Sequence, residues 1–267
     1  MISTREQAAE TCIQLSAVAV KLIYQLNHMP PLQSQVNHFY KGVLVRTGVH
    51  LKDAATILHT NRDEHISTAF VIFRVLLDDL LRSSYVYAST NRQLAIDALT
   101  SKAHSDLYDT WKVAGQLNAE LQLGDAMTEA IADAERDKFL NDAASASYIT
   151  LDRSGNNTFK KGVQTSEMVR TIKTCPRVAK YSRGYVLYKH MSHYVHYSML
   201  PHELDRAQLS RALEIQFIDE VMFLAYHMIK VAQEVLAETN TQMTWPTGPA
   251  DASFGSESYS VHPAPTP

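Results

Sequence analysis

The stretch Ile66-Ser-Thr-Ala-Phe70-Val-Ile-Phe73-Arg-Val-Leu76-Leu77-Asp-Asp-Leu80-Leu81 decides the fold class of this chain. Its large apolar residues recur three and four positions apart, which places them on one face of an α-helix. The pattern predicts a helix over residues 60–88 whose apolar face lies in the core. Among the 267 residues it is the strongest helical pattern.

Both ends of the chain repeat this pattern. A helix from about Ser3 to His28 is predicted to begin at a capping box of Ser3 and Glu6 and to stop before Pro30-Pro31. A long amphipathic helix is predicted over residues 205–238, and its apolar stripe belongs in the core. That stripe consists of Leu209, Leu213, Phe217, Val221, Leu224, Met228 and Val231.

The middle of the chain is predicted to be helical as well. Residues 32–59 form a helix interrupted near Gly42 and Gly48, and further helices cover 91–123, 125–145 and 166–173. Residues 152–162 are polar and turn-forming, so they are expected to be a surface loop. The prediction is an all-α fold: a single-domain bundle of six to eight helices over residues 1–239, with a disordered tail over residues 240–267.

Composition narrows the function classes. The two cysteines, Cys12 and Cys175, match neither a disulfide framework nor a zinc motif, so a reducing compartment is expected and the cytoplasm is predicted. No apolar run approaches the roughly 18 residues that span a bilayer, so no membrane association is predicted. The chain has no glycine-rich phosphate-binding motif, which argues against nucleotide-dependent catalysis. No cofactor is predicted.

The net charge of −3 conceals a basic segment. Residues 153–189 carry a net charge of +8, which leaves −11 for the rest of the chain. A local basic field on an acidic protein is typical of a polyanion-binding site, although these cations could instead pair with acidic helices of the same chain. The cations are Arg153, Lys160, Lys161, Arg170, Lys173, Arg177, Lys180, Arg183 and Lys189, beside one acid, Glu167.

The stretch from Pro176 to Pro201 concentrates histidines, cations and tyrosines and contains no carboxylate. Its bracketing prolines predict a helix, in which residues seven apart project from nearly the same side. Arg183 and His190 therefore share one face. A second face holds Tyr181, Tyr185, Lys189, Ser192 and His196.

These residue types suit the cleavage of RNA by its own 2′-hydroxyl. Histidine exchanges protons near neutral pH, and arginine or lysine stabilises the charge of the phosphorane. This chemistry needs no metal. Moreover, His190, His193 and His196 do not converge on one ion from a single helix, so no metal site is predicted.

The Arg-x6-His spacing of Arg183 and His190 resembles the Arg-x(4 to 6)-His signature of HEPN domains. Lys189 and His196 repeat the same spacing in this sequence. The resemblance implies an all-helical, metal-independent ribonuclease of a bacterial toxin or defence system. It also implies a homodimer with a composite site, and an antitoxin or another protein as partner.

Tyr188, Ser192 and His196 are similar to the Tyr-x3-Ser-x3-His stretch of a second bacterial helical family. That family carries an earlier Arg-x3-Glu, which Arg74 and Asp78 match with aspartate in place of glutamate. With Arg82 they recur at i, i+4 and i+8, so they are predicted to form a structural ladder. The ladder is expected to anchor the later helix by pairing Asp78 with Lys189 or His196.

The sequence thus leads to a hypothesis with assigned roles. Proton transfer is assigned to His190 and His196, phosphate stabilisation to Arg183 and Lys189, and an orienting hydroxyl to Ser192. RNA binding is assigned to Lys160, Lys161 and Tyr185. The alternative is a non-catalytic helical module that binds a protein or nucleic acid partner through the loop around Lys160 and Lys161. A third possibility is that the polar residues of 176–201 make internal hydrogen bonds and that the function lies elsewhere.

Overall fold

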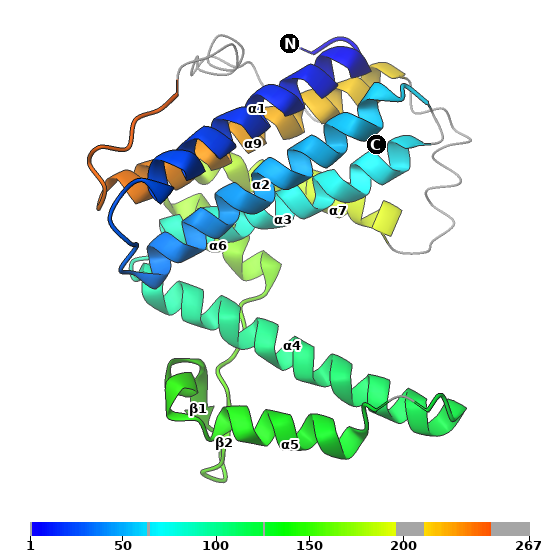
Figure 1. The fold of residues 1–267 in the computed structure, drawn as a ribbon, viewed down its shortest axis with the longest axis vertical. Helices are drawn as coiled ribbons and strands as arrows, with labels where there is room; N and C mark the ends of the chain where they lie inside the picture. Colours follow the sequence, from blue (N-terminus) through cyan, green and yellow to red (C-terminus); the bar gives the residue numbers. More distant parts are fainter. Residues whose placement is uncertain (1, 63–64, 125, 196–210, 247–267) are drawn as a thin grey trace. The chain divides into compact units, whose positions relative to one another are not determined.

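The computed structural model describes residues 2–62, 65–124, 126–195 and 211–246, apart from the side chains of residues 193–195. The predicted all-α class is confirmed, and the described residues contain eight α-helices (Figure 1). They are α1 (Arg5–Asn27), α2 (Gln35–His59), α3 (Ile66–Ala88), α4 (Arg92–Leu121), α5 (Glu129–Leu140), α6 (Thr165–Thr174), α7 (Gly184–Val195) and α9 (Arg211–Ala237). Two 3-10 helices, η2 (Ala143–Tyr148) and η3 (Ala179–Arg183), and two strands, β1 (Ile149–Leu151) and β2 (Asn157–Phe159), complete the elements.

The chain folds into two compact units. The first contains Met1–Ala88 and the chain from Val169 onward, and the second is Ser89–Met168. Residues 1–239 were predicted to form a single bundle. Within this range, residues 89–168 form a compact unit of their own between α3 and α6.

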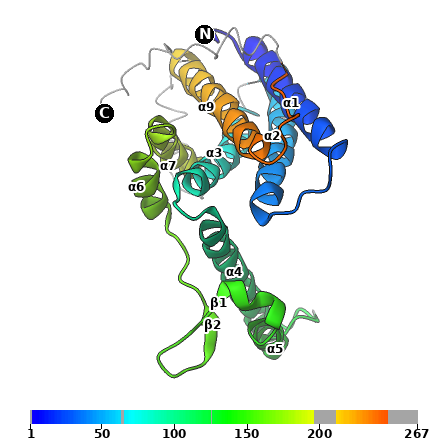
Figure 2. The ribbon, with the colours of Figure 1, turned by 90° about the vertical axis from the view of Figure 1, so that its left-hand side faces the viewer.

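Helix α9 lies at the centre of the first unit. It contacts α1, α2, α3 and α7 (Figure 1, Figure 2), and every residue from Val221 to Ile229 is buried. A helix with neighbours on all sides must be apolar around most of its circumference, which is why its buried residues extend beyond the predicted stripe. The core positions predicted on α3 are also buried from Phe70 to Leu81, including Phe73 and Leu80, whereas Ile66 at the start of the helix is half-buried.

Helices α1 and α2 pack closely at a glycine. The Ser16 hydroxyl donates to the Gly48 carbonyl at 2.7 Å, and a Cβ at Gly48 would lie 3.6 Å from the Ala19 Cβ. The predicted interruptions of α2 are wrong, because the helix is continuous from Gln35 to His59 and includes both Gly42 and Gly48. The cap of α1 is also one residue later than predicted: Thr4 accepts from the Gln7 N–H at 3.1 Å.

The predicted helix over residues 176–201 is shorter than expected. Residues 179–183 form η3, and the α-helix begins only at Gly184. A 3-10 helix turns 120° per residue, so Tyr181 does not continue the face of Tyr185 and Lys189. Tyr181 is instead fully buried, which corrects its predicted place on the second polar face.

The second unit is a pair of antiparallel helices, α4 and α5, with a short β-ribbon. A cluster of aromatic rings joins these elements: Phe139 of α5 lies 4.3 Å from His104 and 5.8 Å from Tyr108, measured between ring centroids. The predicted loop at 152–162 contains strand β2, which pairs antiparallel with β1. Asp152 closes the turn by accepting from the Ser154 and Asn156 N–H groups at 2.8 and 2.9 Å. Three-residue strands are too short to give an alternating pattern in the sequence.

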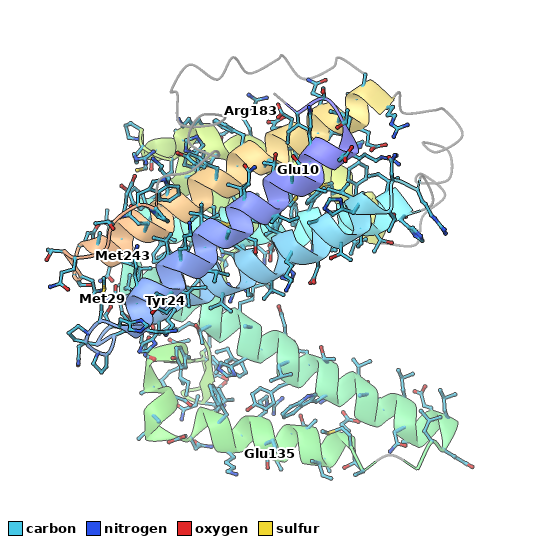
Figure 3. All side chains as sticks on the ribbon, turned by 45° about the horizontal axis from the view of Figure 1, so that its top comes forward. Glu10, Tyr24, Met29, Glu135, Arg183 and Met243 are labelled. Atoms are coloured by element: carbon cyan, nitrogen blue, oxygen red, sulfur yellow. The ribbon has the colours of Figure 1, made fainter. Side chains whose placement is uncertain are left out.

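The chain after α9 continues to pack as far as Pro246. Met243 is 4% exposed (Figure 3), and the Gln25 amide donates to the Thr244 carbonyl at 3.1 Å. The Trp245 ring lies 5.4 Å from the ring of Tyr226 on α9. The folded part therefore extends past the predicted boundary at residue 239, and the remainder of the predicted tail, residues 247–267, lies outside the described residues.

Candidate functional site

A glycine determines where α7 begins. A Cβ at Gly184 would lie 2.7 Å from Leu80 Cδ2 of α3 and 3.5 Å from Leu224 Cδ1 of α9. Because Gly184 has no side chain, the first turn of α7 approaches both neighbouring helices closely. Gly184 thereby positions the polar residues before and after it, beginning with Arg183.

One polar side of α7 faces α9. Arg183 pairs with Glu220 at 3.1 Å, and the His190 ring lies 4.8 Å from the Phe217 ring. Phe217 and Glu220 are three residues apart on α9, so Arg183 and His190 both point toward the same helix. Both residues therefore face α9 as predicted, although Arg183 is the last residue of η3 and only His190 belongs to α7.

Glu220 is a member of this site that the sequence analysis did not identify. Burial raises the pKa of its carboxyl, Arg183 acts in the opposite direction, and Asp219 raises it further. A carboxyl group with a raised pKa beside a cation is able to exchange a proton. Only the packing of α7 on α9 brings Glu220 to Arg183, because 37 positions separate them in the sequence.

A second polar side of α7 faces α3. Arg74 Nη2 donates to the Tyr188 hydroxyl at 2.8 Å, and the Arg74 guanidinium carbon lies 4.7 Å from the centroid of that ring. The two stretches that resemble the Arg-x3-Glu and Tyr-x3-Ser-x3-His motifs are thus in contact. The predicted ladder is only half formed, since Asp78 pairs with Arg82 at 2.9 Å while Arg74 turns to α7. Arg74 thus contacts the later helix, whereas the predicted pairing of Asp78 with His196 lies outside the described residues.

The remaining predicted residues of α7 differ in their surroundings. The Ser192 hydroxyl donates to the Tyr188 carbonyl at 2.6 Å, so its proton is used within the helix. Lys189 is exposed, with Nζ 5.6 Å from the Tyr185 ring centroid. His196 lies outside the described residues.

Lys160 and Lys161, predicted to bind RNA with Tyr185, belong to the second unit, whereas Tyr185 belongs to the first. The Lys160 ammonium donates to the Ser147 carbonyl at 2.5 Å, which ties β2 to η2. Lys161 is 85% exposed and lies 3.7 Å from Glu167. Of the two lysines, Lys161 has the more accessible charge.

The six cations of residues 169–195 divide into two groups. Residues 169–195 include no acid, and two of their cations reach carboxylates of α9: Arg183 at Glu220, and Arg177 at Glu234. The other four are exposed and form no ion pair within the part of the chain that the structure describes. We call these four the basic segment: Arg170, Lys173, Lys180 and Lys189.

His227 is buried beside these cations. Its ring lies 5.2 Å from that of Tyr181, and neither ring nitrogen has a hydrogen-bond partner among the described residues. Burial is the main cause that lowers its pKa to about 3, and Lys180, Arg177 and Lys230 lower it further. His227 is therefore neutral at physiological pH and fills space in the core.

The second unit contains a polar cavity of about 760 Å³ between α4, α5 and the β-ribbon. Three carboxylates, those of Asp109, Asp137 and Asp152, line it beside Arg136. Arg136 already pairs with Asp137 at 3.0 Å, and Asp152 closes the turn of the ribbon. Within the described residues, no group of three or more His, Cys, Asp or Glu side chains could hold a metal ion.

The fold and the site define an all-α protein in which a polar helix, α7, packs against α3 and α9 and follows a segment rich in cations. No helix in the described ranges is both long and apolar enough to cross a membrane. No protein-family model, curated protein or solved structure matches the chain.

Proposed function

We propose that this protein is a helical module that binds nucleic acid through the basic segment. The observation that carries the proposal is the group of four exposed cations on and between α6 and α7, in a stretch without a carboxylate. The α9 carboxylates that could have neutralised this surface are already paired with Arg177 and Arg183. Cations without ion-pair partners attract phosphates and release the counterions bound to them.

The proposal predicts a steep dependence on salt. Four phosphate contacts give a slope of about −3 to −4 for the logarithm of affinity against the logarithm of salt concentration. Fluorescence anisotropy of a labelled oligonucleotide, measured between low and physiological salt, provides this slope. An affinity that stays constant with salt would contradict the proposal.

Two double variants with equal charge changes locate the site. Lys173→Gln with Lys180→Gln removes two cations of the basic segment and should reduce the salt slope by about 2. Lys21→Gln with Lys52→Gln removes two exposed lysines of α1 and α2 and should leave the slope unchanged. Equal effects of both double variants would mean that only net charge matters and that the basic segment is not the site.

RNA cleavage is the second candidate function that we propose, in a toxin or defence system and as a homodimer. The observation that favours it is the orientation of Arg183 and His190 toward Glu220 and Phe217, which lie about one turn apart on α9. In this proposal His190 and His196 transfer protons, while Arg183 and Lys189 stabilise the phosphorane.

Cleavage is tested by incubating RNA with purified protein in the presence of a chelator. Products with 2′,3′-cyclic phosphate ends are expected from the wild type, and His190→Ala should lose at least a hundredfold in rate. His38→Ala, which changes an exposed histidine of α2, should cleave as the wild type does. The absence of cleavage by the wild type, or equal rates for the two variants, would eliminate this candidate.

A further inference from the structure

Two tyrosines of α7 form an ordered pair beside the basic segment. The rings of Tyr185 and Tyr188 lie 6.3 Å apart between centroids, and their planes are inclined by only 15°. Both residues are half-buried, and Tyr185 is followed by the exposed Val186. In contrast, the tyrosines at positions 40, 181 and 226 are fully buried in the core.

Cations hold this pair in place. Arg74 covers the Tyr188 ring at 4.7 Å and also hydrogen-bonds its hydroxyl, so the ring is fixed from α3. Lys189, one turn after Tyr185, holds its ammonium 5.6 Å from the Tyr185 ring centroid. Rings that are already ordered lose little conformational entropy when a ligand stacks on them.

Aligned aromatic rings interleaved with cations match the chemistry of an unpaired nucleotide. A base stacks on a tyrosine ring, and the adjoining phosphate is neutralised by a neighbouring lysine or arginine. In a duplex the faces of the bases are covered by their neighbours in the stack, so only a single strand offers them.

We infer that Tyr185 and Tyr188 form a stacking platform that makes this protein prefer single-stranded nucleic acid to duplex. The inference rests on the proposed binding of nucleic acid by the basic segment and adds the class of partner. Tyr185 provides the accessible ring, Tyr188 and Arg74 support it from behind, and Lys189 contacts the phosphate beside the stacked base.

The test compares two single strands of equal length and charge, one with bases and one with abasic sites throughout. Anisotropy should give an affinity for the base-containing strand on the order of tenfold higher than for the abasic strand. A hairpin duplex should bind like the abasic strand. Ribose and deoxyribose versions of each strand show whether the preference depends on the sugar, which the stacking itself does not require.

Substitutions then assign the preference to the ring. Tyr185→Leu should reduce affinity for the base-containing strand to that for the abasic strand and leave abasic binding unchanged. Tyr185→Phe retains the ring and should retain the preference. Tyr24→Leu replaces a tyrosine of α1 that is 65% exposed and should have no effect. Circular dichroism of each variant confirms that its helices are intact.

The outcomes separate the two proposals. If both strands bind equally and Tyr185→Leu changes nothing, the stacking platform is wrong while the basic segment is still the binding site. If neither strand binds, nucleic-acid binding fails and the platform fails with it. If the strand with bases binds better but Tyr185→Leu retains that preference, stacking occurs elsewhere and the assignment to Tyr185 is overturned.

Discussion

The two compact units place their charges differently. In the first, Arg5 of α1 meets Glu214 of α9 through two hydrogen bonds of 2.6 and 2.7 Å, and both residues are buried. In the second, Lys102 pairs with Asp106 at 2.9 Å while both side chains are well exposed, at 39% and 60%. Exposed pairs contribute little to stability, whereas removing one partner of a buried pair is costly. The stability of the first unit therefore depends on specific packing around α9, whereas the stability of the second depends on the close contact of α4 with α5.

Each unit contains one of the two tryptophans, so their stabilities can be measured separately. Trp245 packs on Tyr226 in the first unit, and Trp111 lies 5.2 Å from Tyr108 in the second. A Trp111→Phe background leaves fluorescence only from the first unit, and a Trp245→Phe background leaves it only from the second. Urea unfolding in these two backgrounds supplies the measurement for the predictions below.

The largest effect is expected from Glu214→Gln in the first unit. This change leaves the buried Arg5 charge without its carboxylate and should lower the free energy of unfolding by about 3 to 5 kcal/mol. The matched change Asp106→Asn breaks an exposed pair in the second unit and should cost at most about 0.5 kcal/mol. Similar losses for the two variants would show that the two units do not differ in this respect.

The next effect concerns the contact of α4 with α5. A Cβ at Gly115 would lie 2.3 Å from the Glu129 nitrogen and 2.4 Å from the Thr128 carbonyl carbon, both backbone atoms. Gly115→Ala must therefore displace the start of α5 and should destabilise the second unit by about 2 to 3 kcal/mol. Trp111 fluorescence should report the loss while Trp245 reports none. Unchanged stability would mean that α4 and α5 can separate without cost.

A decrease in pH is expected to lower the free energy of unfolding of the first unit, because the unfolded chain binds a proton at His227 more readily than the folded chain does. Above pH 6.5 this residue is neutral in both the folded and the unfolded chain, whereas below pH 6.5 only the unfolded chain binds the proton until the folded pKa of about 3 is reached. The free energy of unfolding should thus fall as pH decreases from 6.5 toward 3, by roughly 2 kcal/mol at pH 5. Relative to the wild type, His227→Phe should lose this component of the pH dependence. Parallel stability curves for both proteins would rule out a neutral buried His227.

The smallest effect compares two helix glycines of the first unit. Gly184→Ala forces the Leu80 side chain to move and should destabilise by about 1 kcal/mol. At Gly42, by contrast, the nearest obstacle is the Arg46 side chain at 3.4 Å, so Gly42→Ala should stabilise α2 by about 0.5 to 1 kcal/mol. Thermal unfolding followed by Trp245 should shift in opposite directions. A Gly184→Ala variant that is as stable as the wild type or more stable would show that Gly184 is an ordinary helical glycine.

Local patterns were sufficient for the long helices but not for their short neighbours. The spacing of Phe73 and Leu80 predicted both the helix and its buried face, because a long amphipathic helix repeats its pattern over many turns. The 3-10 turn before Gly184 and the ribbon around Asp152 are each only a few residues long and leave no periodic pattern. Their forms depend on contacts with other elements.

Some features of the candidate site were also predictable from local spacing, whereas others were not. Helical spacing predicted that Arg183 and His190 share a face, and both do face α9, although Arg183 belongs to η3 and only His190 belongs to α7. The pairing of Arg183 with Glu220, and that of Arg74 with Tyr188, join residues far apart in the sequence. No local periodicity predicts which cation will find a partner.

Periodicity and composition along the chain are sufficient to predict the all-α class and the central apolar helices. They also predict the concentration of positive charge before and within α7. Which of those charges are neutralised depends on the packing of the helices. The carboxylates of α9 reach Arg177 and Arg183, while Arg170, Lys173, Lys180 and Lys189 form no ion pair within the described ranges. The physical reason is that ion pairing requires a few ångströms of proximity, which the packing of distant helices sets.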